Sequence, residues 1–521
     1  MLIVAFKPGH DGHIACVKDG VLNFSYEAEK DSNPRYASVG VELFVEACSE
    51  IGQIPDAIGI SGWSKGDNPE SGTSIGGGYS GLALPPATSS QFFGKTVRVV
   101  ADSHERSHIM CAYGMSPFPQ GQACYALVWE GHIGSFYFID EDVRIRKLGD
   151  VLKYPGMRYA FAYGVGDPKF NLRPGQIRLG DAGKLMALAA YGRRADEGSA
   201  EYDFVSDLLS DQLTTESLDK RKYSESVFFN AGVESQAIKD IARTISDGMF
   251  ELFFNRVRTL VDRKAPLLIS GGCGLNCDWN RQWVDSDLFS DVFVPPCPND
   301  VGSAIGTAID SQFLLTGSAK IEWDVYRGQS FVDDSYDVDG FRRNELDYRA
   351  VAELLHCGAI LGWADGRAEV GPRALGNRSI LAAPFEKSTL DRLNAIKQRE
   401  SFRPIAPMCL EERATEYFDL HGPSPHMLYF ARVKRDSLKA VTHVDGSSRP
   451  QTVNPSQNPK VHALLKAFEA VSGVGALCNT SLNFNGAGFI NRTSDLARYA
   501  RETGLDGFVA RDKLYIKSNP K

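Results

Sequence analysis

Residues 2–26 read LIVAFKPGHDGHIACVKDGVLNFSY, and this stretch decides the fold. An apolar run, a turn rich in glycine and proline (KPGHDG), a second run, an Asp-Gly turn and a third run predict three consecutive strands. The same order returns at residues 125–147, which read YALVWEGHIGSFYFIDEDVRIRK. Two such units far apart in one chain indicate an internal duplication.

In a duplicated α/β protein with paired hairpins, the two turns can face each other across a cleft. Backbone N–H groups in such turns can hold phosphates. This is the arrangement of the actin-like ATPase and sugar-kinase fold. We therefore expect an α/β (α+β) protein whose N-terminal part is a duplicated actin-like ATPase domain, although three-strand meanders are also common elsewhere.

Size and charge narrow the class of protein. The chain of 521 residues is long enough for two or more domains. A net charge of -8 and a pI of about 5.8 argue against broad nucleic-acid binding but allow a local basic pocket. No apolar run approaches the roughly 18 residues of a membrane span, and the N-terminus lacks the features of a signal peptide. With its ten scattered cysteines, the chain is expected to be a cytoplasmic enzyme with reduced thiols and no membrane partner.

Two histidines, His104 and His108, have the spacing i, i+4. On a helix this spacing puts both imidazoles on one face, about 6 Å apart along the axis, where they could share a metal ion. Two ordinary surface or core histidines would give the same pattern. Asp300 precedes a helix of small residues at 302–308 and would lie at a cleft. It could equally be a plain helix N-cap.

Two other stretches could meet a nucleotide. Asp181 and Lys184 lie one turn apart at the start of a predicted helix, where an ordinary ion pair is the alternative. Residues 267–277 (LLISGGCGLNC) predict a strand, a glycine loop that would let a ribose or phosphate pass closely, and a helix. The loop is not a Walker A motif, and its two cysteines are interpreted as incidental thiols. The nucleotide-binding residues predicted in the N-terminal part are Asp181, Gly183, Lys184, Gly271, Gly272, Gly274 and Asn276.

Cations gather later in the chain. Residues 371–381 (GPRALGNRSIL) contain two arginines and no acidic residue. Arginine suits phosphate and carboxylate oxygens, and glycine lets a ligand approach the backbone. These residues could bind a small, highly charged anion. The alternative for the cations is a solvated basic surface, and the alternative for Ser481 and Asn483 is a simple turn. The predicted anion-binding residues are Arg373, Lys397, Arg399, Arg403, Arg449, Ser481 and Asn483.

Together these stretches resemble the O-carbamoyltransferases of the nodulation and antibiotic-tailoring family, over nearly the whole chain and in the same order. The motifs are GKLMALAAYG, SGGCGLN, GPRALGNRSIL, KQRESFRPIAP and NTSLNFNG. The resemblance implies an actin-like domain at residues 1–340, similar to the tRNA threonylcarbamoylation ATPase. It implies a smaller domain at residues 341–521, similar to the YrdC carbamoyl-adenylate-forming fold. A break in periodicity at 315–345 places the linker there.

The chemistry that the resemblance implies has two stages. In the C-terminal domain, carbamoyl phosphate and ATP, with Mg²⁺, give carbamoyl adenylate and pyrophosphate, with Arg373 and Lys397 as catalytic residues. In the N-terminal domain, an acceptor hydroxyl attacks the carbamoyl carbon. His10, beside Asp11, is the expected general base, since an alcohol must lose its proton; a turn histidine that caps the hairpin is the alternative.

The resemblance also implies a divalent metal, Fe²⁺ in this family. The implied ligands are His104, His108, Glu130 and Asp300. The family commonly has aspartate where this chain has Glu130, whose side chain is one carbon longer. The identity of the metal and a contribution from His132 therefore stay open.

Within the family, the N-terminal motifs IVAFKPGHDG, SHERSHIM and VWEGHIGSFY are similar to the branch that carbamoylates the 3-hydroxymethyl group of a cephem in antibiotic biosynthesis. Another small alcohol, such as a hydroxy amino acid, is the alternative acceptor. An actin-like small-molecule kinase, a nucleotide-dependent regulator and a tRNA modifier are the competing functions. No nucleic-acid partner is expected, and a homodimer is suggested only by analogy.

Overall fold

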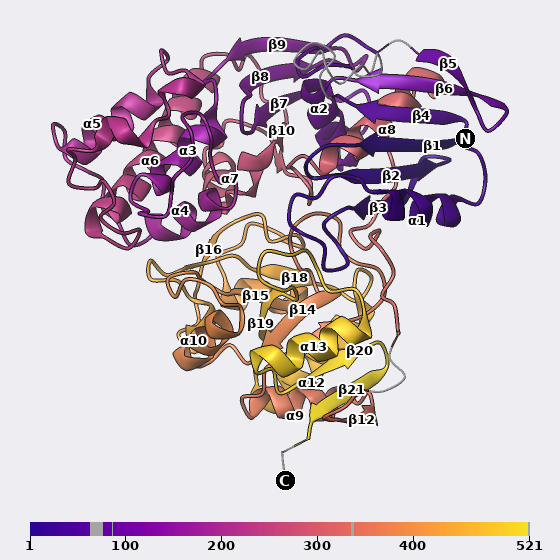
Figure 1. The fold of residues 1–521 in the computed structure, drawn as a ribbon, viewed down its shortest axis with the longest axis vertical. Coiled ribbons are helices and arrows are strands. Elements are labelled where there is room, and N and C mark those ends of the chain that lie inside the picture. The colour runs from indigo at the N-terminus through magenta and orange to yellow at the C-terminus, as the bar shows by residue number, and fades with distance from the viewer. Residues whose placement is uncertain (63–76, 86, 335–337, 519–521) are drawn as a thin grey trace.

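The computed structural model describes residues 1–62, 77–85, 87–334 and 338–518. Two sheets lie next to each other across the upper half of the molecule, with a helical lobe beside the second and a further sheet below them (Figure 1). The strands of the two upper sheets are β1 (Leu2–Lys7), β2 (His13–Lys18), β3 (Val21–Glu27), β4 (Ala57–Ser61), β5 (Ala87–Phe92), β6 (Lys95–Asp102), β7 (Cys124–Trp129), β8 (Gly134–Ile139), β9 (Ile145–Asp150), β10 (Leu267–Ser270) and β11 (Val292–Phe293).

The two upper sheets share one connectivity. Their strand orders are β3-β2-β1-β4-β6-β5 and β9-β8-β7-β10-β11. In each, a three-stranded antiparallel meander is followed by a strand that pairs in parallel with the first strand of that meander. The predicted duplication and the α/β class are therefore confirmed, and the shared connectivity is that of an actin-like fold. The last strand of the second meander lies at β9, a few residues beyond the predicted 143–147.

Two helices fill the space between the upper sheets. They are α2 (His104–Met115) and α8 (Gly302–Thr316), and they pack against each other. A Cβ atom at Gly306 of α8 would lie 1.8 Å from the carbonyl oxygen of Ser107 in α2, so glycine is required for this close approach. The packing places the first turn of α2 next to the start of α8.

The remaining N-terminal helices cover the outer faces and build the lobe. In the lobe, α3, α4 and α6 pack on one another, and the aromatic residues of β7 and β8 join its core. These helices are α1 (Val41–Ile51), α3 (Pro155–Gly164), α4 (Asp181–Ala189), α5 (Ala200–Leu209), α6 (Gln236–Val257) and α7 (Cys277–Asp285).

The C-terminal part forms a mixed eight-stranded sheet with order β12-β21-β20-β13-β14-β19-β15-β18. The strands of this part, including a separate two-stranded ribbon, are β12 (Phe341–Glu345), β13 (Leu361–Ala364), β14 (Arg378–Ala382), β15 (Ala406–Leu410), β16 (Ala431–Arg432), β17 (Ser447–Ser448), β18 (Gln451–Val453), β19 (Ala476–Ser481), β20 (Gly507–Ala510) and β21 (Lys513–Lys517). Its helices are α9 (Tyr348–His356), α10 (Lys387–Ile396), α11 (Ala414–Tyr417), α12 (Pro459–Ser472) and α13 (Thr493–Thr503). Among the described residues, no helix is long and apolar enough to cross a membrane.

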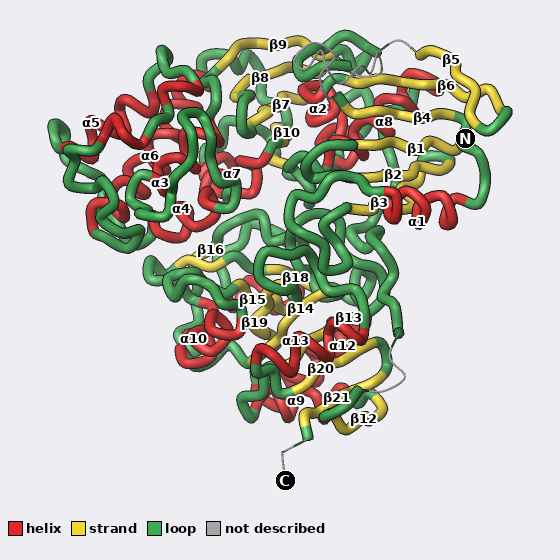
Figure 2. The backbone as a smooth tube through the Cα atoms, in the orientation of Figure 1, coloured by secondary structure: helices red, strands yellow, loops and turns green. Residues whose placement is uncertain are grey.

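Loops join the upper sheets to the lower one, as Figure 2 shows in green. The segment expected as a linker is packed over its first half: Leu22 N–H donates to Glu322 O at 2.8 Å, and Gly328 N–H donates to Ala368 O at 2.9 Å. The loop after β3 reaches down to the loop after β19, where Arg35 N–H donates to the carbonyl of Gly486 at 3.0 Å. Backbone hydrogen bonds from several segments therefore fix the two parts to each other.

Candidate active site

Three predicted metal ligands meet between α2 and α8. The Nε2 atoms of His104 and His108 lie 3.2 Å apart, and Asp300 Oδ1 lies 3.7 Å and 3.5 Å from them. Ser103 caps α2, accepting from Arg106 N–H, so the two imidazoles project from successive turns at the start of a well-formed helix. We call His104, His108 and Asp300 the imidazole–carboxylate cluster.

The donor set of this cluster fits a divalent metal. The Nδ1 atom of His108 lies 3.1 Å from Ser270 Oγ, which leaves Nε2 directed at the other two residues. Burial lowers the pKa of His104 to about 4, although Asp300 opposes this effect, so this imidazole is in the neutral form that binds metals. Two imidazoles and one carboxylate are a common ligand set for zinc, iron and similar ions. Asp300 does not cap α8, because residue 301 holds the cap position.

Asp300 also faces the turn after β1. Its Oδ2 atom lies 3.1 Å from Lys7 Nζ and 3.6 Å from His10 Nε2. On the other side of the His10 ring, Nδ1 lies 3.0 Å from Asp11 Oδ2. Burial opposes ionisation of Asp300, but the imidazoles of the cluster and the Lys7 ammonium hold its pKa well below its usual range. The predicted base, its neighbour and the predicted metal ligand therefore form one group.

Lys7 was not singled out from the sequence. Its side chain is 0% exposed, and it ends an apolar strand. A lysine in the last position of such a strand, directly before a turn with candidate catalytic residues, is the signal that could have identified it.

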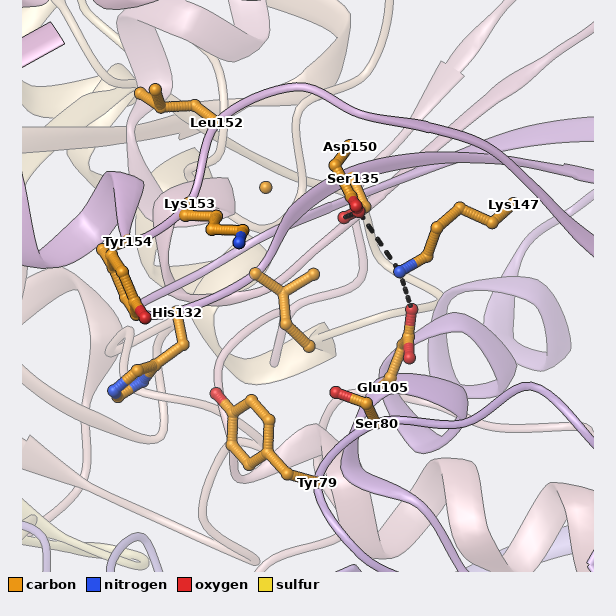
Figure 3. Close-up of a pocket in the computed structure, with 12 residues that line it drawn as sticks. Tyr79, Ser80, Glu105, His132, Ser135, Lys147, Asp150, Leu152, Lys153 and Tyr154 are labelled. Carbon is orange, nitrogen blue, oxygen red and sulfur yellow. Dashed lines mark hydrogen bonds and ion pairs between the residues drawn. The ribbon is translucent and has the colours of Figure 1, made fainter. Parts of the chain in front are cut away.

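The predicted ligand Glu130 lies outside the imidazole–carboxylate cluster. Its Oε1 atom accepts hydrogen bonds from Tyr79 Oη at 2.5 Å and from the backbone N–H groups of His132 and Ile133 at 3.1 Å and 2.8 Å. The Tyr79 ring stacks on His104 with centroids 4.7 Å apart. His132 is exposed and touches Tyr79 edge-on, as Figure 3 shows for these two rings. Glu130 thus fixes an aromatic wall beside the cluster.

The glycine loop after β10 has the predicted strand–loop–helix form. Gly271 has φ +96°, and a Cβ atom there would lie 2.4 Å from Trp129 O, whereas a Cβ atom at Gly272 would meet open space. Gly274 approaches Pro298 closely. Asn276 accepts from Trp279 N–H at 3.3 Å and so acts as the N-cap of α7.

The other nucleotide stretch begins α4. Asp181 accepts from Arg178 Nε at 2.7 Å and lies 3.4 Å from Lys184 Nζ, so the ion pair that was the alternative interpretation is present. Lys184 also reaches Glu400 of the C-terminal part at 3.2 Å. A Cβ atom at Gly183 would again meet open space, which leaves room for a ligand beside it.

Like charges dominate the second site. The cations that lower one another's pKa values or lie close enough to contribute to them are Arg35, Arg373, Lys397, Arg399, Arg403 and Arg449, and we call them the cationic cluster. Burial, followed by Arg449, lowers the pKa of Arg373 to about 9. Burial, followed by Arg403, lowers that of Arg399 to about 9. The Nε atoms of Arg373 and Arg449 are buried without a hydrogen-bond partner among the described residues.

Lys397, Ser481 and Asn483 come together as one unit. Lys397 Nζ donates to the carbonyls of Ser481 and Asn483 at 2.7 Å and 3.0 Å and to Asn483 Oδ1 at 2.7 Å. Ser481 Oγ donates to the same amide oxygen at 2.6 Å. Ser481 is the last residue of β19, so the sheet sets its position. The sequence had instead suggested a loop for this serine.

The two arginines of GPRALGNR have different environments. Arg378 is fully buried, and its guanidinium donates to Asn491 Oδ1 at 2.6 Å and to the carbonyl of Asp365 at 2.6 Å. It therefore serves the C-terminal core. Arg373 donates only to Leu275 O, at 3.1 Å, among its hydrogen bonds to described residues, and it stays in the cationic cluster.

The same loop joins the two parts of the molecule. Gly371 N–H donates to Glu27 Oε1 at 2.7 Å, and its carbonyl accepts from Lys30 Nζ at 2.8 Å. Gly371 has φ +90°, and a Cβ atom there would lie 2.3 Å from Pro296 O, close to the chain that leads to Asp300. Buried Glu369, which the sequence did not suggest, accepts from three backbone N–H groups of the loop.

Arg35 is the member of the cationic cluster that sequence reasoning missed. It belongs to the loop after β3 in the N-terminal part, and its Nε lies 2.9 Å from Glu29 Oε2. Its field contributes to lowering the pKa values of Arg373 and Lys397. No local motif marks this arginine, because the packing of the two parts alone brings it to the site.

Comparison with known proteins identifies the family of the chain. The family models described as carbamoyltransferase N-terminus and carbamoyltransferase C-terminus match residues 90–309 and 352–517. The chain is 48% identical to the 3'-hydroxymethylcephem-O-carbamoyltransferase of Amycolatopsis lactamdurans, over 99% of this chain and 100% of that protein. The chain belongs to the carbamoyltransferase family.

This carbamoyltransferase is also 33% identical to nodulation protein U of Bradyrhizobium diazoefficiens, over 100% of this chain and 99% of that protein. Among solved structures, full-length HypF in its phosphate- and nucleotide-bound form matches with a TM-score of 0.33 and 12% identity, over 61% of this chain and 56% of that chain. The family assignment rests on the full-length sequence matches.

Proposed function

We propose that this carbamoyltransferase is an ATP-dependent O-carbamoyltransferase that acts on a 3-hydroxymethylcephem. Residues 341–521 form carbamoyl adenylate, and residues 1–340 transfer its carbamoyl group to the acceptor hydroxyl. The acceptor class comes from the relative that is 48% identical over its full length. The single observation that carries the first stage is the cationic cluster, which gathers six basic side chains in an acidic protein.

In the first stage, carbamoyl phosphate is hydrolysed to carbamate and phosphate. A carbamate oxygen then attacks the α-phosphorus of ATP, the bond from that phosphorus to the bridging oxygen breaks, and pyrophosphate leaves. Arg373 and Arg449 offer buried, unpartnered N–H donors to the negative charge that shifts during this transfer. Ser481 and Asn483 hold Lys397 in place, a bound anion would favour its charged form because burial and the neighbouring arginines lower its pKa, and Mg²⁺ would accompany ATP.

In the second stage, the acceptor hydroxyl attacks the carbamoyl carbon and AMP leaves. Asp11 orients the His10 imidazole through Nδ1, and the opposite nitrogen, which lies 3.6 Å from Asp300 Oδ2, would take the proton of the hydroxyl. His104, His108 and Asp300 would hold a divalent metal, which would polarise the carbamoyl oxygen. Together with the imidazoles of His104 and His108, Lys7 keeps Asp300 ionised and in place. Gly183 and Gly272, where a Cβ atom would meet nothing within 4 Å, would not obstruct the adenylate.

The test uses purified protein with Mg²⁺, ATP and carbamoyl phosphate. We expect pyrophosphate and carbamoyl adenylate, detected by mass spectrometry, before any acceptor is added, and a carbamoylated cephem once a 3-hydroxymethylcephem is present. ADP in place of pyrophosphate would indicate a kinase and contradict the proposal. Adenylate formation with no reaction of the cephem would leave the first stage standing and move the acceptor to another small alcohol.

A further inference from the structure

A cavity of about 350 Å³ adjoins the imidazole–carboxylate cluster. This volume lies at the lower end of the range of roughly 300–1,000 Å³ that is usual for small-molecule sites. Tyr79 lines the cavity, and the same ring stacks on His104. A small molecule in this cavity would therefore lie one aromatic ring away from the predicted metal ligands.

We propose that this cavity binds the acceptor alcohol and that Lys153 recognises a carboxylate group on that acceptor. The inference rests on the proposed function, since it assumes that the reaction has a small hydroxylated acceptor. It assigns to Lys153 a role in substrate specificity and not in the chemical step.

The carboxylates of the cavity wall are already satisfied by the protein. Glu105 accepts from Tyr137 Oη at 2.6 Å and from Gly81 N–H at 2.8 Å, and Lys147 Nζ lies 2.9 Å away. Lys147 also lies 3.2 Å from Asp150, which accepts from a serine hydroxyl at 2.7 Å. Figure 3 shows this network along one side of the cavity. Each of these charged groups is already engaged by a hydrogen bond or an ion pair within the wall, so none of them is left to bind a charged ligand.

Lys153 differs from Lys147 on the opposite side of the same cavity. Among the described residues, no side chain or carbonyl forms a hydrogen bond or ion pair with its ammonium group. In Figure 3 that group points toward the middle of the cavity, between Tyr154 and Asp150. One ammonium group without a hydrogen bond or ion pair to a described residue suits one carboxylate, whereas the triphosphate of ATP would need several cations, which the cationic cluster provides.

The rest of the wall suits a compact ring system. The His132 ring meets Tyr79 and Tyr154 edge-on, with centroids 5.6 Å and 5.7 Å away, and Leu152 adds an apolar, buried surface. Glu130 holds the Tyr79 hydroxyl and so keeps this wall in place. A small ring held here by apolar contacts, with its carboxylate at Lys153, would have its hydroxyl free to point toward the cluster.

The test compares Lys153→Gln with wild type on two probes, a 3-hydroxymethylcephem 4-carboxylate and its 4-methyl ester. The matched control is Lys169→Gln, which makes the same charge change at an exposed position away from the cavity. We expect Lys153→Gln to raise the KM for the carboxylate about tenfold, with kcat and adenylate formation unchanged. The ester should show the same KM with both proteins, because the group that Lys153 recognises is masked.

A rise in KM for both probes alike, or no change for either, would overturn the assignment. Equilibrium binding of the 4-carboxylate, measured in parallel, separates this proposal from the proposed function. The protein could form adenylate and still fail to carbamoylate the cephem, which would contradict the proposed acceptor. If Lys153→Gln weakened binding of the 4-carboxylate in that case, the carboxylate site would still be supported. The absence of any binding to wild type would overturn the carboxylate site, whatever the outcome of the adenylate assay.

Discussion

The imidazole–carboxylate cluster and the cationic cluster differ in how their charges are balanced. In the first, Asp300 lies within 3.7 Å of two imidazoles and 3.1 Å from Lys7, so unlike groups face each other. In the second, six cations share one region, and the acidic groups that pair with them, Glu29 and Glu400, each lie within 3.6 Å of a single arginine. The fold must hold the second cluster together against repulsion.

This difference teaches what each site needs. The first cluster has nitrogen and oxygen donors at mutual distances that a cation can bridge, and the neutral form of His104 favours a metal. The second has depressed pKa values and unpartnered donors, which an anion with several charges would relieve. In the mechanism that we propose, adenylate formation needs the anion site and carbamoyl transfer needs the metal site.

The largest effect is expected from Arg373→Ala in the cationic cluster. Removing this donor should reduce pyrophosphate release on the order of a thousandfold, because its buried Nε has no partner among the described residues and would otherwise bind the anion. Stopped assays of pyrophosphate from ATP and carbamoyl phosphate measure the effect. Lys387→Ala, an exposed lysine of the same part, serves as the control and should behave as wild type. Normal pyrophosphate release by Arg373→Ala would remove this residue from the first stage.

His104→Ala should affect only the other half-reaction. We expect carbamoylation of the acceptor to fall by roughly a hundredfold or more while pyrophosphate release without acceptor is unchanged. Bound metal, measured by elemental analysis, should fall in parallel. His421→Ala provides a matched histidine control at an exposed position. Acceptor carbamoylation at the wild-type rate would contradict the role of this cluster.

The pH dependence of anion binding should reveal the depressed pKa values of the second cluster. Arg373 and Arg399 have pKa values of about 9, and a bound polyanion favours their charged forms. Binding therefore takes up protons, and the affinity for pyrophosphate should fall as the pH rises from about 8 to about 10, by at most about tenfold per unit for each proton taken up. Calorimetry in buffers of different ionisation enthalpy measures this uptake. An affinity that is constant over this range would show that the arginines keep ordinary pKa values.

The smallest effect is expected from Arg35→Gln. This arginine is partly exposed and already paired with Glu29, so its contribution to anion binding is screened. The KM for ATP should rise roughly threefold with little change in kcat, and Arg349→Gln, an exposed arginine elsewhere, should leave it unchanged. An unaltered KM in Arg35→Gln would mean that the cationic cluster is confined to the C-terminal part.

Much of this architecture could be predicted from local patterns. The two meanders, the helix that bears His104 and His108, and the glycine loop after β10 follow from periodicity and turn residues that lie close together in the chain. Family motifs also identified Lys397, Ser481 and Asn483, which the structure brings into contact.

Contacts between distant segments were harder to predict. Arg35 and Glu369 lie in stretches without a motif. Only long-range packing shows that Arg35 lies near Arg373 and that Glu369 binds the backbone of the loop at 371–378. Hydrogen-bond partners also separate Arg373 from Arg378, although both belong to one motif and are identical in type. Sequence spacing could not assign one arginine to the site and the other to the core.

The attachment of Gly371 to Glu27, Lys30 and Pro296 has a consequence for recombination within the family. A chimaera that joins the first half of one relative to the second half of another would replace one side of this joint and keep the other. Exchange of halves should succeed only where the loop after β3 and the GPRALG segment come from the same parent. The chain thus inherits its two reaction centres as a unit, even though each occupies its own stretch of sequence.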